Sequence, residues 1–188
     1  MANISDSYNN FSFDLYKEVA KEQGSKWKNK FIINNLITSL LDSSNLFYSP
    51  YSIFVALSIC KAGSRKNTEL QLKKVLSYKN LSNDEIHKAN LELHNHLNSL
   101  SDQISLNIAN KIFQRNSYKI HKEFIDLLKL FYKSDAQGLD FSNSAASAKV
   151  INDWVATQTN NKIQNLVPET VITDLTKLIL VNAIYFKG

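Results

Sequence analysis

Apolar residues recur at helical spacing through much of the chain. Phe11, Leu15 and Val19 lie four residues apart with charged residues between them, which predicts an amphipathic helix over 11–21. The same pattern, with polar residues able to cap the starts, predicts further helices over 67–76, 83–97, 120–131 and 143–160. A large part of the molecule is therefore expected to be helical.

One predicted helix is apolar on nearly every side. Ser49 can cap its start and Pro50 can occupy its first position, so we expect it to run from Pro50 to about Lys61. Because few polar residues interrupt this run, the helix should be buried on most sides. Its single cysteine, Cys60, is predicted to be a small buried hydrophobe and not a nucleophile.

Two other segments have the character of strands. Apolar and polar residues alternate over 104–113, and 178–186 is a continuous apolar run of branched and aromatic residues. The second run is typical of a central strand covered on both faces, in which a buried Asn182 would need hydrogen-bond partners. A short third strand is predicted over 137–141. Strands among many helices, with only 4 Gly and 2 Pro, indicate an α+β fold.

Composition and charge narrow the classes of function. With 44% hydrophobic residues the chain can form a packed core, so disorder is not expected. The net charge of +5 is spread along the sequence, and nucleic-acid binding is therefore disfavoured. The densest basic stretch suits a solvated helix face, with weak polyanion contact as the functional alternative; its members are Lys61, Arg65, Lys66, Lys73 and Lys74.

The residues that chemistry commonly uses form no recognisable motif. His94 and His96 are two positions apart, so on a helix they point away from each other and cannot chelate one metal ion. We expect all four histidines (His87, His94, His96 and His121) to lie at the surface and the protein to hold no metal or cofactor. Ser49 lacks the glycines of a nucleophile elbow, so no enzyme is predicted.

The start of the chain and its hydropathy bear on location. The first residues contain neither a basic segment nor an apolar segment of a secretion signal, and no stretch is long enough for a membrane span. These features predict a cytoplasmic protein with no membrane partner.

Several motifs, in order along the chain, resemble the serpin family of serine protease inhibitors. The resemblance covers about residues 8–188 and is carried by NLFYSPYSI (45–53), AGSRKNT (62–68), ANKIF (109–113), INDWV (151–155) and LVNAIYFKG (180–188). It implies the part of the serpin fold that holds helices A to F and strands of the main sheet. By that resemblance the C-terminal half of the fold is missing from 1–188.

The resemblance also implies roles for particular residues and a mechanism. Ser49, Ser52 and Asn182 match the polar cluster of the family's shutter, where strands of the main sheet part. A complete serpin offers an exposed loop to a serine, or a cysteine, protease and inserts that loop into the sheet after cleavage. The loop would lie beyond Gly188, so this chain alone is predicted not to inhibit.

Two departures from the family pattern suggest a second hypothesis. Residues 24–43 form an additional amphipathic segment, which is expected to be an insertion. A chain that stops after the strand 178–186 would leave an open sheet edge. The alternative is therefore a non-inhibitory binding fragment that pairs with a complementary serpin segment or with itself. Members of the family work inside and outside cells, so an extracellular location stays open.

Overall fold

The computed structural model describes residues 4–22, 48–99 and 105–187. The expected insertion over 24–43 lies outside the described residues. The helices of the described part are α1 (Ile4–Glu22), α3 (Pro50–Gly63), α4 (Lys66–Val75), α5 (Asn83–Asn98), α6 (Lys122–Tyr132) and α7 (Ser144–Gln158), with a 3-10 turn at Glu169–Val171. The strands are β1 (Ser105–Arg115), β2 (Asp135–Leu139) and β3 (Leu178–Lys187).

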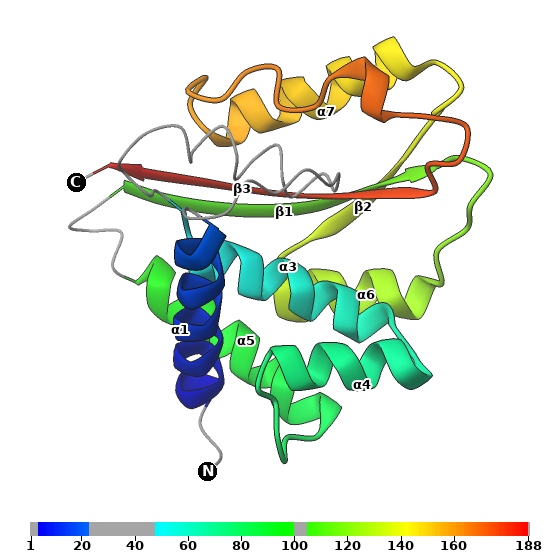
Figure 1. The fold of residues 1–188 in the computed structure, drawn as a ribbon. Helices are drawn as coiled ribbons and strands as arrows, with labels where there is room; N and C mark the ends of the chain where they lie inside the picture. Colours follow the sequence, from blue (N-terminus) through cyan, green and yellow to red (C-terminus); the bar gives the residue numbers. More distant parts are fainter. Residues whose placement is uncertain (1–3, 23–47, 100–104, 188) are drawn as a thin grey trace.

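The described strands form one sheet with helices on both faces (Figure 1). Their order is β2-β1-β3, with β1 parallel to β2 and antiparallel to β3. Helix α7 covers one face, where Ile151 and Val155 pack in a buried cluster with Phe113 and Val181 of the sheet. Helices α3 and α6 cover the other face, and α1, α4 and α5 lie farther from the sheet on that side. The mixed α+β fold is confirmed.

Capping explains where several helices begin. Ser49 accepts a hydrogen bond from the backbone N–H of Ser52, and Pro50 is the first residue of α3, as predicted. Ser82 and Glu85 form a reciprocal capping box at the start of α5. Helix α1 begins at Ile4, earlier than the periodicity of 11–21 predicts, because Ile4 also packs into the cluster formed with α3.

One prediction about burial is wrong and another is confirmed. Cys60 is exposed and not buried, because α3 covers the sheet with one side, where Val55 and Ile59 lie, and Cys60 is not on that side. Strand β3 is covered on both faces, by α3 and by α7, as expected, and it pairs with β1 among the described residues. Leu178 and Phe186 near its ends are 41% and 60% exposed.

Candidate functional site

Two asparagines face each other in the middle of the sheet. Asn110 of β1 and Asn182 of β3 are register partners, and the Asn182 Nδ2 donates to the Asn110 Oδ1 over 2.7 Å. Because side chains alternate along a strand, both lie on the face that Ile108 and Ile112 turn toward α3 and α6. Asn110 is 5% exposed, so the pair is a polar contact inside an apolar layer.

The hydrogen bonding continues from this pair to the third strand. The Ser134 hydroxyl, also buried, donates to the backbone carbonyl of Asn110 over 2.9 Å. Ser134 directly precedes β2, so polar contacts link β3, β1 and the start of β2. Asn182 is predicted from the sequence, whereas Asn110 and Ser134 are not. Asn110 could have been found from the sequence, because it is a polar residue at an inward-facing strand position between Ile108 and Ile112.

Ser49 and Ser52 form a second polar group at the start of α3. The Ser52 backbone N–H donates to the Ser49 Oγ over 3.3 Å. The Ser52 Oγ itself is buried and has no hydrogen-bond partner among the described residues. Helix α3 contacts β3, yet within the described part no hydrogen bond joins the serines to the Asn110–Asn182 pair. The three predicted residues thus belong to two separate groups.

The predicted basic stretch divides into buried and exposed members. The Lys61 side chain is 1% exposed; its ammonium donates to Asn83 Oδ1 and lies 3.5 Å from a carboxylate oxygen of Glu69. Burial lowers the pKa of Lys61, and the Glu69 carboxylate opposes that shift. Lys61 is therefore not available to an external polyanion, because the starts of α4 and α5 enclose it. Arg65, Lys66 and Lys74 are exposed, while Lys73 is half-buried.

The prediction that all four histidines are at the surface is wrong for two of them. His87 and His94 are 6% and 9% exposed because their side of α5 faces inward. The His87 Nδ1 lies 2.8 Å from the Tyr132 hydroxyl of α6, and the His94 Nε2 lies 2.8 Å from the Asn98 Nδ2. Burial lowers the pKa of both imidazoles. Within residues that the structure describes, no three potential metal ligands of the His, Cys, Asp or Glu type cluster.

Among the described residues, no helix combines the length and the apolar composition that a bilayer span requires.

Comparisons with known proteins agree with the fold. The family model described as Serpin (serine protease inhibitor) matches residues 6–188. Human Serpin B3 is 34% identical, over 100% of this chain and 47% of its own length. The chain therefore spans about half the length of the curated relatives it matches.

Solved structures show the same similarity. Emu ovalbumin superposes with a TM-score of 0.80 and 28% identity, covering 100% of this chain and 47% of the other. Native protease nexin-1, crystallised with heparin, superposes with a TM-score of 0.72 and 26% identity, covering 84% of this chain and 42% of the other.

Proposed function

Because the chain belongs to the serpin family, we propose that it supplies the N-terminal half of a serine protease inhibitor that acts by inserting a cleaved loop into its main sheet. In that role the chain contributes the sheet β2-β1-β3, with β3 as the strand beside which the sheet opens. The inserting loop belongs to the C-terminal half, so the 188-residue chain alone is expected not to inhibit.

The observation that carries this proposal is the asparagine pair inside the apolar layer. Two apolar residues would pack there without the free-energy cost of burying polar groups. Asn110 and Asn182, in contrast, must keep hydrogen bonds wherever the strands move. Hydrogen bonds of this kind can be exchanged for others when a new strand arrives. The buried Ser52 Oγ, at the start of α3, has no partner among the described residues and is a further polar group that such a rearrangement would satisfy.

The test compares this chain with a longer product of the same transcript. The longer protein is incubated with trypsin, chymotrypsin and elastase, and covalent complexes that survive SDS are sought by electrophoresis. We expect a 1:1 complex with one or more proteases, and none with the 188-residue chain as control. The proposal is wrong if the longer protein forms no complex and its sequence contains no hinge of small residues before an exposed loop.

The second candidate function is binding through the edge of β3. One side of this strand is unpaired among the described residues, and its exposed Leu178 and Phe186 add apolar surface to the free backbone groups. Unpaired strand edges of this kind recruit further strands. The chain would then pair with a complementary serpin segment or with a second copy of itself.

A weaker proposal concerns polyanions. Arg65, Lys66 and Lys74 expose their charges around α4. The similar protease nexin-1 was crystallised with heparin, which favours a sulfated sugar over nucleic acid as the occupant. Binding of this kind is electrostatic and should weaken as salt is added.

A further inference from the structure

Residues 160–177 connect α7 to β3 and run back over the same side of the sheet as α7 (Figure 1). We call this segment the strap. It includes the 3-10 turn Glu169–Val171 and has only that one turn of regular structure. What holds the strap in place is therefore mainly its contacts with α7 and with the sheet.

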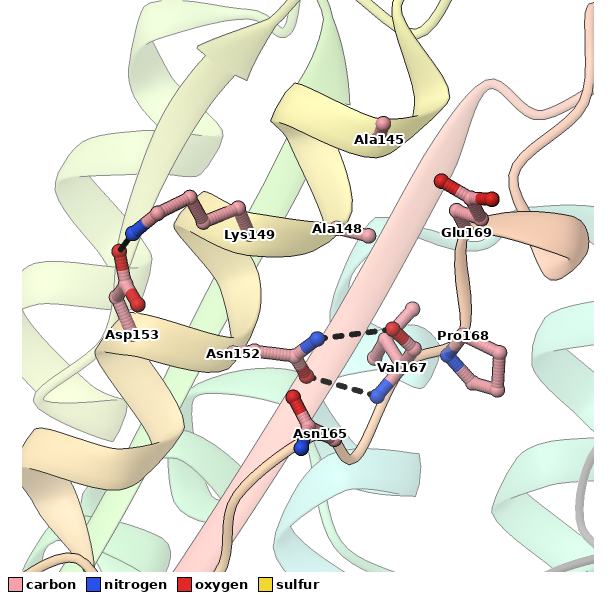
Figure 2. A pocket seen from close by; sticks show the side chains of 9 residues that line it. All are labelled: Ala145, Ala148, Lys149, Asn152, Asp153, Asn165, Val167, Pro168 and Glu169. Atoms are coloured by element: carbon pink, nitrogen blue, oxygen red, sulfur yellow. Dashed lines mark hydrogen bonds and ion pairs between the residues drawn. The ribbon is translucent and has the colours of Figure 1, made fainter.

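Residues 161–163 of the strap stay close to the end of α7, because their N–H groups donate to the Ala156 carbonyl and to Thr159. Farther along, a single amide side chain of α7 binds the backbone of Val167. The Asn152 Nδ2 donates to the Val167 carbonyl over 2.9 Å, and the Asn152 Oδ1 accepts from the Val167 N–H over 2.8 Å (Figure 2). One side chain thus satisfies both backbone groups of Val167, in the way that a neighbouring strand would. Asn152 lies on α7 and points across to the strap.

Packing between the strap and α7 is uneven. A hollow of about 550 Å³ lies between the strap and α7 beside the Asn152 contact, and Ala145, Ala148 and Glu169 are among its lining residues (Figure 2). The strap residues 160–165 are exposed. Leu166 and Val167 are half-buried against the cluster that α7 forms with the sheet, and the two hydrogen bonds of Asn152 add a specific restraint at this point.

The downstream part of the strap is attached to the sheet instead. The Arg115 guanidinium at the end of β1 donates to three backbone carbonyl groups, at 3.1 Å to Thr176, 3.2 Å to Thr173 and 2.7 Å to Asp174. Ile172 is 4% exposed and packs in the cluster that α7 forms with the sheet. The Arg115 guanidinium and the buried Ile172 side chain therefore hold residues 172–177 through contacts that do not involve Asn152.

We propose that the strap opens in two separate stages, with Asn152 as the latch of its upstream part and Arg115 as the anchor of its downstream part. Release of Asn152 loosens the strap around Val167, beside the hollow on α7, while β3 stays paired with β1. Release of Arg115 loosens residues 172–177 and the entry into β3. Asn152 is thus a positioning residue that controls how firmly α7 and the strap are held together.

Hydrogen exchange measured by mass spectrometry tests this proposal on the 188-residue chain. In N152A, peptides from 160–168 should exchange about tenfold faster or more, because two hydrogen bonds are lost, while peptides from 172–177 stay as in the wild type. In R115A the pattern should be reversed. The matched control is D153A, which removes the neighbouring exposed carboxylate of α7 that pairs with Lys149 and should change neither part.

Milder variants keep the test decisive if an alanine variant does not fold. N152D retains the acceptor for the Val167 N–H and loses the donor, so an intermediate increase over 160–168 is expected. R115K keeps the charge and loses the planar fork, so 172–177 should be affected alone. Peptides from α3 and α5 report global unfolding. Equal changes in both parts of the strap, or unchanged exchange over 160–168 in N152A and N152D, would overturn the proposal.

Discussion

At the scale of single residues, several buried polar side chains are hydrogen-bonded to neutral side chains and not to groups of opposite charge. Asn110 pairs with Asn182, and His87 pairs with a tyrosine and not with a carboxylate. The clearest ionic contact with a buried group is that of Lys61 with Glu69. Burial favours the neutral form of an ionisable side chain such as His87, because the charged form loses its hydration.

The buried histidines predict a fold that weakens in acid. Burial holds the pKa of His87 and His94 below the ordinary value of about 6.5. Lys61 adds repulsion at His87, which Asp84 partly offsets, and Lys133 adds repulsion at His94. Below about pH 6.5 the unfolded chain therefore binds more protons than the folded chain. The free energy of unfolding should be fully retained above that pH and should decrease as the pH drops below it.

Circular dichroism melting at about pH 7.5 and about pH 5.5 measures this effect. The midpoint of the wild type should fall at the lower pH by a few degrees, and in the variant H87Q/H94Q it should fall by less. The exposed His121 is the control, and H121Q should keep the wild-type dependence. An unchanged loss of stability in H87Q/H94Q would show that other groups cause the acid sensitivity.

At the scale of elements, α4 presents different chemistry on its two sides. On one side Glu69 accepts from the Asn83 side chain and lies beside Lys61, and Lys73 donates to the Leu81 carbonyl over 2.7 Å. These contacts attach α4 to α3 and to the start of α5. The exposed cations are Arg65 and Lys66 at the start of the helix and Lys74 in its last turn, and the Arg65 guanidinium also donates to the Ala62 and Ser64 carbonyls.

Heparin chromatography tests whether this end of α4 contacts a polyanion. The double variant R65A/K66A should elute at a lower salt concentration than the wild type, because two exposed cations are removed from one place. The control K122A/K149A removes the same charge from α6 and α7, where both lysines pair with aspartates. Equal shifts in the two variants would mean that net charge alone determines retention and that α4 has no specific role.

At the scale of the whole molecule, the sheet is covered on both faces and open along β3. The apolar clusters on its two faces hold α3 and α6 on one side and α7 on the other. The outer edge of β3 has no partner strand among the described residues. Because unpaired strand edges recruit further strands, we propose this edge for association with another chain.

Light scattering coupled to size-exclusion chromatography can detect such association. The wild-type chain should contain dimers or larger species that increase with concentration. F186E places a charge on the exposed apolar surface of β3 and should shift the population toward monomer. The control is L175E, because Leu175 lies on the strap and is 85% exposed. This variant should have no such effect. A wild type that stays monomeric at all concentrations would contradict pairing through β3.

Local patterns in the sequence were enough for much of the architecture. The periodicity of apolar residues located α6 and α7, and a nearly continuous apolar run after Ser49 and Pro50 located α3, because caps and helical periods depend on residues only a few positions apart. The ordered motifs from 45–53 to 180–188 also indicated the serpin family, which the match over 6–188 confirms.

Tertiary contacts decided which side chains are buried and which polar groups meet. Asn110 and Asn182 are 72 positions apart, and only the register of β1 against β3 brings them together. The burial of Lys61 and His87 and the exposure of Cys60 depend on which side of each helix its neighbours cover. A sequence specifies the period of a helix, but the direction in which its sides face follows from the packing of distant segments.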